Sequence, residues 1–271
     1  MKGGVVMLKR LLAVVVAGVV GISQIFAMEI KSDTDAIVAM GESEAEMRHM
    51  LEFYAFIGAG VKYKKPKDKL KEHIKEHEEV MQAIGNRYKG NKAIMKSVNA
   101  EKKAWEPVKN SLLTALSGKK TQEQMTKEAL FVHANIRSVI KELENIKKNL
   151  VKKSGVKNAK YLDAAEEIGA SARRLSAHYM MKMWDLPDPT IMEHWNRGVE
   201  IYKHSLEVLE KSKFAKNPEF KKELDTAKQS YDFFMMVIKF KNKYVPIMVQ
   251  RKADAAIKAG KKMVEIILKD K

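Results

Sequence analysis

Two arginines, Arg48 and Arg173, occupy equivalent places in the two halves of the chain, and each is followed six residues later by a tyrosine, Tyr54 or Tyr179. Arg174 adjoins the second arginine. A guanidinium group presents a planar fork of N–H donors that matches an oxyanion, and it keeps its charge when it is partly desolvated. These five residues are therefore the candidate ligand-binding residues, and a small anionic solute is the predicted ligand.

A structural role is the alternative for Arg48 and Arg173. An arginine can extend its apolar stem along a helical bundle and pair its head group with a nearby carboxylate. Glu44, Glu46 and Glu167 are close enough in sequence to be such partners. The direction in which the two arginines point, into the bundle or along its surface, distinguishes the two roles.

His73, His77 and Met81 form a second candidate site, because they recur every four residues and so share one face of a helix. Two imidazoles at this spacing can hold one metal ion, and a thioether suits copper. The surrounding lysines and glutamates are typical of a solvated helix face, which is the alternative. The second half of the chain has Gly198 and Tyr202 at the corresponding places, so it does not repeat the pair of histidines.

The densest group of methionines, Met180, Met181 and Met183, lies beside His178 and Trp184. In an exported protein such a group could belong to a copper site or to a haem held by His and Met. Methionines at helical spacing more often fill a hydrophobic core. We therefore predict no bound cofactor.

Nothing in the sequence predicts catalysis. The chain has no cysteine, which excludes thiol nucleophiles, disulfides, thiolate metal sites and covalent haem attachment. No glycine-rich nucleophile turn precedes a serine, and there is no phosphate-cradling loop. We expect a binding or interaction protein and not an enzyme.

Residues 1–27 have the three parts of a secretory signal peptide. Lys2, Lys9 and Arg10 form a basic region, residues 11–22 are apolar, and residues 23–27 form a cleavage site that ends in alanine. The apolar stretch is shorter than the ~20 residues of a transmembrane helix, so cleavage is favoured over a retained anchor. We expect the mature protein to be soluble and periplasmic.

The formal net charge of +17 could serve nucleic acid, anionic lipid or an anionic solute. Export from the cytoplasm argues against nucleic acid. Because lysines are spread along the helices and mixed with glutamates, as in residues 69–72, much of this charge is typical of solvated helix faces. The competing interpretation of the chain is an interaction module whose basic face meets an envelope protein or an anionic membrane.

Apolar residues recur at helical spacing along the whole mature chain, and alternating β-branched runs are missing, so the predicted fold class is all-α. Proline, glycine and serine breakers divide the chain into eight helices. The first seven are predicted to end near Val61, Gly85, Leu116, Ser154, Asp185, Ser212 and Lys243, and the eighth to begin at Pro246.

One half of this pattern repeats the other. Sliding the sequence by 125 residues aligns Arg48 with Arg173, Tyr54 with Tyr179, and the helix breakers with one another. Aliphatic matches alone would carry little weight, since any two amphipathic helices can be slid into register. The predicted architecture is two tandem antiparallel four-helix bundles, residues 28–155 and 156–271, related by an internal repeat.

Residues 168–179, Ile-Gly-Ala-Ser-Ala-Arg-Arg-Leu-Ser-Ala-His-Tyr, resemble the start of the PilJ-type domain. This domain is the periplasmic sensory module of type IV pilus chemotaxis transducers, and it is related to the input domain of nitrate/nitrite sensor kinases. The residues that match the family pattern are Arg173, Leu175 and Ser176, whereas Arg174, Ala177 and His178 replace its Met, Gln and Arg. The first half carries a weaker copy, with Gly41, Arg48 and a later Trp105.

The resemblance implies that each half is a four-helix bundle whose first helix carries an arginine at the family's ligand site. In the sensor kinases two copies of this helix face one another across a dimer, and two tandem units in one chain would reproduce that geometry internally. The chain departs from the family after its second unit, because no transmembrane or signalling helix follows before Lys271. We expect a periplasmic, sensory-type binding protein that presents a small anion to a membrane receptor.

Overall fold

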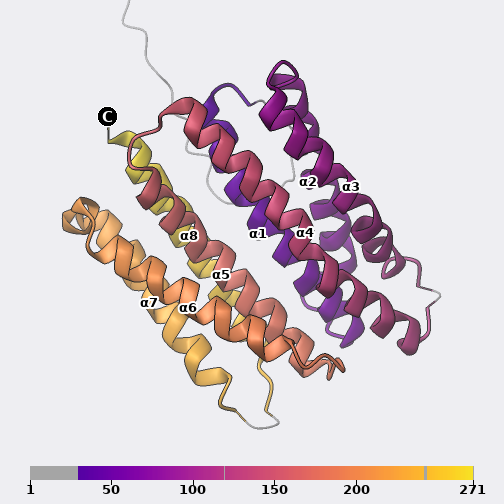
Figure 1. Ribbon diagram of the computed structural model, residues 1–271. Coiled ribbons are helices and arrows are strands. Elements are labelled where there is room, and N and C mark those ends of the chain that lie inside the picture. Colours follow the sequence, from indigo (N-terminus) through magenta and orange to yellow (C-terminus); the bar gives the residue numbers. More distant parts are fainter. Residues whose placement is uncertain (1–29, 119, 241–242, 271) are drawn as a thin grey trace, which may run out of the picture.

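The structure, a computed structural model, describes residues 30–118, 120–240 and 243–270. These residues form eight α-helices and one short 3-10 helix and contain no β-strand, so the predicted all-α class is confirmed for this part of the chain (Figure 1). The predicted signal peptide lies outside the described residues. The helices are α1 (Asp33–Gly58), α2 (Pro66–Arg87), α3 (Lys92–Thr114), α4 (Gln122–Ser154), α5 (Ala159–Met183), α6 (Ile191–Glu210), η1 (Lys213–Lys216), α7 (Pro218–Val237) and α8 (Pro246–Lys269).

Local sequence signals explain where several helices begin. At α1 the Ser32 hydroxyl accepts a hydrogen bond from the Asp35 amide, and the Asp35 carboxylate accepts one from the Ser32 amide. Thr121 and Gln124 form the same capping box at α4. Each box satisfies backbone donors that the first helical turn leaves unpaired. Pro246 opens α8, as predicted, because the first position of a helix needs no N–H donor.

Two helices, α1 and α7, end three or more residues earlier than the sequence pattern predicts. α1 ends at Gly58 and not near Val61, because Gly60 adopts a positive φ of 72°. The Val61 amide then donates to the Phe56 carbonyl oxygen and the Gly60 amide to that of Ile57, which is the Schellman arrangement. α7 ends at Val237, before the predicted Lys243. Apolar periodicity runs on through these turns, so it overestimates the length of both helices.

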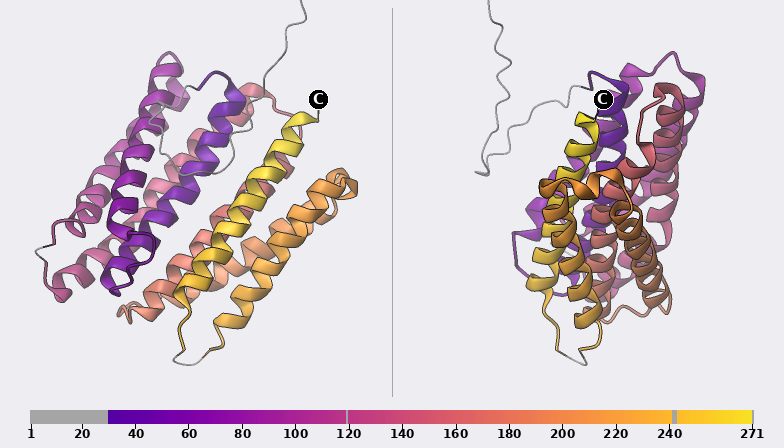
Figure 2. Two further views of the ribbon diagram at one scale, coloured as in Figure 1. Left: turned by 180° about the vertical axis from the view of Figure 1, so that it is seen from behind. Right: turned by 90° about the vertical axis from the view of Figure 1, so that its left-hand side faces the viewer.

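The helices α1 and α5 lie at the centre of the molecule. α1 packs against α2, α4 and α5, and α5 packs in addition against α6 and α8. α3 lies on α4, and α7 lies on α8. Figures 1 and 2 show the consequence: α2 and α3 lie at one edge of the array, and α6 and α7 lie at the opposite edge.

Burial on all sides distinguishes the two central helices from the others. Every residue from 47 to 56 in α1 and from 168 to 181 in α5 is buried, whereas a surface helix buries only one stripe. The hydrophobic core is one continuous cluster with members on all eight α-helices. Polar residues of α1 and α5, including Arg48, Arg173 and Arg174, are therefore forced into the interior.

Helix boundaries and packing partners recur at the offset found in the sequence. α1 ends at Gly58 and α5 at Met183, while α2 begins at Pro66 and α6 at Ile191. α1 packs on α2 and α4 just as α5 packs on α6 and α8. Among the described helices, none combines the length and the apolarity that a membrane span requires.

Candidate functional site

Arg48 of α1 and Arg174 of α5 meet at one cavity. Both are buried, with 3% and 9% of their surface exposed. The cavity has a volume of about 50 Å³, and α4 and α6 complete its wall. We name it the arginine cavity, and it is lined by Arg48, Leu51, His133, Ile136, Arg137, Ile140, Arg174, His178, His194 and Arg197.

Each of the two buried guanidinium groups has at least one N–H group without a described hydrogen-bond acceptor. Nη1 of Arg48 donates to the carbonyl oxygen of Glu44 at 2.8 Å. Nη2 of Arg48 and Nη1 of Arg174 are buried and donate to no residue that the structure describes. A buried donor without an acceptor costs roughly 1–3 kcal/mol, and more when it is charged. No carboxylate belongs to the described lining, so the cavity offers charged donors without the acceptors that would satisfy them.

Like charges accumulate around Arg174. Burial, followed by the charge of Arg48, lowers the pKa of Arg174 to about 9, and Arg137 and Arg197 act in the same direction while Glu167 opposes them. Arg137 is itself paired with Glu144 at 2.6 Å. The positive charge of Arg174 is therefore less favourable in this cavity than in water, and an anion placed there would stabilise it.

A glycine of α6 makes room for the Arg174 side chain. A Cβ atom at Gly198 would lie 3.0 Å from Cδ of Arg174 and 3.1 Å from Cδ2 of Leu175. These distances are shorter than an ordinary van der Waals contact between carbon atoms. Gly198 thus lets α6 approach α5 and sets the path of the arginine stem toward the cavity.

Three histidines lie beside the arginines in the same cavity wall. Nδ1 of His178 lies 2.6 Å from the carbonyl oxygen of Arg174, an acceptor, so this nitrogen carries a proton. Nε2 of His178 lies 3.1 Å from Nε2 of His133, whose Nδ1 lies 2.7 Å from Oδ2 of Asp188. Burial holds the pKa of His178 well below its usual range. A neutral His178 has its acceptor at Nε2, on the side of His133. The third histidine, His194, stacks on His178 at 5.5 Å between ring centroids.

Arg173, the predicted partner of Arg48, points elsewhere. Its Nη1 donates to Oε2 of Glu52 at 3.0 Å and its Nη2 to Oδ1 of Asp254 at 2.6 Å. Burial alone would lower the pKa of Arg173, but Glu52 and Asp254 raise it above its ordinary value. Both terminal nitrogens of Arg173 are engaged in ion pairs, although its Nε is a buried donor without a described partner, and it is Arg174 that lies with Arg48.

The two predicted tyrosines lie outside the arginine cavity. The hydroxyl of Tyr54 donates to the carbonyl oxygen of Met125 at 3.4 Å, and that of Tyr179 accepts from the amide of Val245 at 2.9 Å. Both rings are buried in the hydrophobic core. Each tyrosine ties its central helix to the start of another helix, α4 or α8, and has no described contact with the cavity lining.

The predicted metal ligands of α2 have separate partners. Nδ1 of His73 lies 2.6 Å from Oε2 of Glu46 on α1, whereas Nε2 of His77 lies 2.8 Å from Oε1 of Glu101 on α3. Met81 is buried and lines, with His77, a cavity between α2 and α3. His73 and His77 therefore bond to carboxylates of two different helices, α1 and α3. Met180 and Met181 lie in the hydrophobic core, the more common role of methionine.

A second cluster, between α1, α4 and α5, has more carboxylates than cations, whereas the arginine cavity has cations and no described carboxylate. Nζ of Lys147 lies 3.3 Å from Glu44, 3.2 Å from Glu166 and 3.0 Å from Asp163. Burial raises the pKa of Glu44 to about 7 and that of Glu166 to about 8, although Lys147 opposes both shifts. Three carboxylates share one lysine here, so this cluster has no free cation for an anionic ligand.

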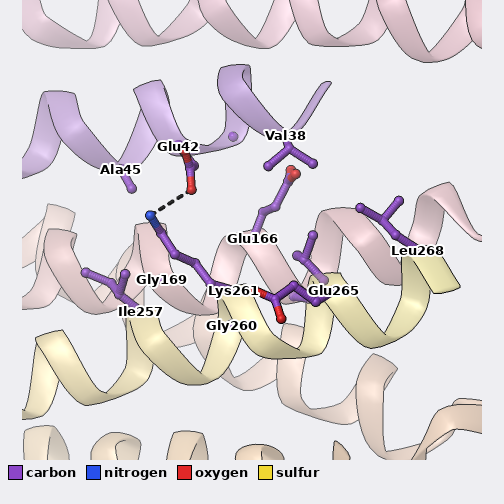
Figure 3. A pocket seen from close by; sticks show the side chains of 13 residues that line it. Val38, Glu42, Ala45, Glu166, Gly169, Ile257, Gly260, Lys261, Glu265 and Leu268 are labelled. Atoms are coloured by element: carbon purple, nitrogen blue, oxygen red, sulfur yellow. Dashed lines mark ion pairs between the residues drawn. The ribbon is translucent and has the colours of Figure 1, made fainter. Parts of the chain in front are cut away.

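The largely apolar cavity of Figure 3 lies between α1, α5 and α8 and has a volume of about 170 Å³. Glu166 projects toward α1, where a Cβ atom at Gly41 would lie 2.4 Å from its Cδ. The cation of the cavity, Lys261, is paired with Glu42 at 2.7 Å. Apolar walls and a paired lysine make it a poor site for an anion.

Sequence reasoning found Arg48 and Arg174 but missed most of the cavity around them. His133, Arg137, His194 and Arg197 lie on α4 and α6, far from either arginine in sequence. His133 and Arg137 are four residues apart and His194 and Arg197 three apart, so each pair shares a helix face, but no local spacing connects one pair with the other or with the arginines. The one sequence signal was the high proportion of basic residues.

Comparisons of the chain with protein-family models, with curated proteins and with solved structures found no match. The resemblance of residues 168–179 to the PilJ-type domain therefore stays a prediction. What the protein does has to be inferred from the geometry and the charges of the cavities described above.

Proposed function

We propose that this protein binds a small oxyanion, such as nitrate or nitrite, in the arginine cavity between its two central helices. The observation that carries the proposal is the pair of buried arginines, Arg48 and Arg174, each with an unpaired N–H group at the same cavity. An oxyanion would accept hydrogen bonds from both guanidinium groups and neutralise part of their charge.

The size of the cavity supports a small ligand. About 10–15 Å³ of such volume holds one water molecule. A volume of about 50 Å³ therefore suits a few waters or one small oxyanion, and it is too small for an amino acid or a sugar. The apolar floor of Leu51, Ile136 and Ile140 would exclude bulk water, which strengthens each charged hydrogen bond.

The chain architecture supports a sensory origin for the site. Helix boundaries and packing partners recur between the two halves, as expected for two tandem four-helix units, and α1 of one unit packs on α5 of the other. An arginine from each unit would then hold one anion. With the predicted signal peptide, we propose a periplasmic, non-catalytic module that presents the anion to a membrane receptor.

The test is ligand binding by the purified protein, measured by calorimetry and thermal unfolding against nitrate, nitrite, phosphate, sulfate and small carboxylates. A ligand that binds only the folded state stabilises it, by about 2.7 kcal/mol at one hundred times its Kd. We expect one anion per chain, and we expect binding to be lost in Arg48→Gln and in Arg174→Gln.

Lysine variants supply the matched control. Arg174→Lys keeps the charge but loses the planar fork, so the affinity should fall at least tenfold, on the order of 1.4 kcal/mol. Arg173→Lys makes the same change one residue away and should bind like the parent, since Glu52 and Asp254 already engage Arg173. Absence of binding by every anion tested, or binding that survives in the double variant Arg48→Gln/Arg174→Gln, would overturn the proposal.

A further inference from the structure

On the other side of α1, four residues of α1 and α2 face one another. Glu46 and His49 are three residues apart on α1, and His73 and Glu76 are three residues apart on α2. Residues at this spacing share one face of a helix. Consecutive packed helices thus present a Glu-x-x-His pair to a His-x-x-Glu pair, and facing pairs of this kind build metal sites in helical bundles.

We propose that Glu46, His49 and His73, assisted by Glu76, bind a divalent transition-metal ion, with Zn²⁺ as the expected metal. This site is independent of the arginine cavity and of the anion proposed there. It shares His73 with the metal site predicted from sequence, but it draws its other ligands from α1 and not from His77 and Met81.

The distances between ligand atoms suit a metal centre. Oε2 of Glu46 lies 2.6 Å from Nδ1 of His73 and 3.6 Å from Nδ1 of His49, and Oε2 of Glu76 lies 3.0 Å from Nδ1 of His73. Ligand atoms of Glu46, His49 and His73 all lie within 4.8 Å of one another. Zinc bonds of about 2.1 Å in tetrahedral geometry place ligand atoms ~3.4 Å apart. Small rotations of these side chains would bring the ligand atoms to this spacing.

The two imidazoles are buried and incompletely satisfied. His49 and His73 are each 8% exposed, and their ring centroids lie 4.3 Å apart. Nε2 of either ring forms no hydrogen bond with a described residue. Buried polar atoms are nearly always paired, so two half-satisfied histidines beside a buried carboxylate oxygen, Oε2 of Glu46, need an explanation. A bound metal ion, with rings reoriented toward it, supplies one.

The surroundings attract cations, against the charge of the whole protein. A cavity of about 280 Å³ borders the cluster, and Glu42, Glu46, Glu76 and Glu79 line it. Its one described lysine, Lys261, is already paired with Glu42. In a chain of net charge +17, four glutamates around one cavity create a local negative field. The cavity also provides a path by which a hydrated ion reaches the ligands.

Neighbouring charges do not oppose this assignment. The cation whose charge acts on His49 is Arg173, and its charge is balanced by Glu52 and Asp254. Two carboxylates and two neutral imidazoles also balance a divalent ion. Two nitrogen and two oxygen ligands suit Zn²⁺, Co²⁺ or Ni²⁺, whereas Ca²⁺ and Mg²⁺ prefer oxygen alone.

The experiment is a titration of the chelator-treated protein with Co²⁺, whose visible absorption reports tetrahedral coordination, followed by displacement with Zn²⁺. We expect one Co²⁺ per chain, displaced by one Zn²⁺. His73→Gln and Glu46→Gln should each weaken the affinity at least tenfold. Because His73 is buried and Glu46 is partly buried, circular dichroism must first show that the variants are folded.

Two further variants make the result decisive. Glu76 is half-exposed, so Glu76→Gln should fold like the parent and still bind Co²⁺ several-fold more weakly. His133→Gln is the control, since His133 bonds to Asp188 and lines the separate arginine cavity, so it should leave metal binding unchanged. No stoichiometric Co²⁺ binding, or equal losses in His133→Gln and His73→Gln, would overturn this ligand set. Arg174→Gln should keep metal binding, which separates this proposal from that of the anion.

Discussion

Arg173 and Arg174 are neighbours on α5 with opposite surroundings. Arg173 is held by Glu52 and Asp254, while Arg174 faces Arg48 across a cavity without a described carboxylate. Successive residues of an α-helix point about 100° apart, so the two side chains enter different interfaces of the same buried helix. The paired arginine holds helices together, and the unpaired arginine is available to a ligand.

The largest loss of stability should follow from removal of the ion-paired arginine, Arg173. Arg173→Gln leaves Glu52 buried without a cation, and loss of one partner of a buried ion pair costs roughly 3–5 kcal/mol. Urea unfolding of the variant and the parent measures this difference. A loss below about 1 kcal/mol would mean that the two arginines do not differ in their structural role.

The cluster around Lys147 is a third kind of buried charge environment, in which carboxylates outnumber cations. The pKa of Glu44 is raised to about 7 and that of Glu166 to about 8, above the ordinary value of 4.5. The folded state therefore holds these protons while the unfolded state releases them, so stability is present at acid pH and falls as pH rises through 7 to 8. In the parent this contribution should decrease between pH 4 and pH 9.

The variant Glu166→Gln removes one ionisable group from that cluster. It should match the stability of the parent at pH 4 and exceed it at pH 9 by on the order of 2 kcal/mol, because the folded parent must ionise a buried Glu166 whose pKa is raised to about 8. Unfolding in urea at both pH values checks the difference. A variant that is less stable than the parent at pH 9 would contradict the direction of the shift.

Crowding the unpaired arginine should have a smaller effect. Gly198→Ala places a methyl group 3.0 Å from Cδ of Arg174, which should cost about 1–2 kcal/mol of stability and reduce anion affinity several-fold. Gly85→Ala is the control, because its Cβ would meet only Cγ1 of Val98, at 3.9 Å. Alanine should stabilise that helix by roughly 0.5–1 kcal/mol. Equal changes in stability and anion affinity in Gly198→Ala and Gly85→Ala would contradict the role of Gly198 in positioning Arg174.

The smallest change in stability is expected at the unpaired arginine itself. Arg174→Gln breaks no ion pair and removes a charge that Arg48 repels, so stability should stay within about 1 kcal/mol of the parent or rise. Thermal unfolding without added anion measures this. A loss as large as that of Arg173→Gln would show that Arg174 has a partner that stabilises the fold.

Local signals in the sequence were sufficient to predict the number and the approximate positions of the α-helices. Apolar periodicity and breakers such as Pro66 and Pro246 determine where most helices lie, because each acts within a few residues of itself. The missed end of α1 at Gly60 is also a local event, a glycine at positive φ that the periodicity of its neighbours conceals. The arginines could be named because the chemistry of a guanidinium group is a property of the residue.

Tertiary structure alone decided which arginine is free. Asp254 reaches Arg173 from α8, and His133 and His194 reach the other face of α5 from α4 and α6. Arg48 and Arg173 are equivalent in the repeat, yet the cavity joins Arg48 to Arg174, since α1 and α5 pack on one another with different neighbours on each side. The charge balance around a buried side chain depends on which helices surround it, and that is set by packing among distant segments.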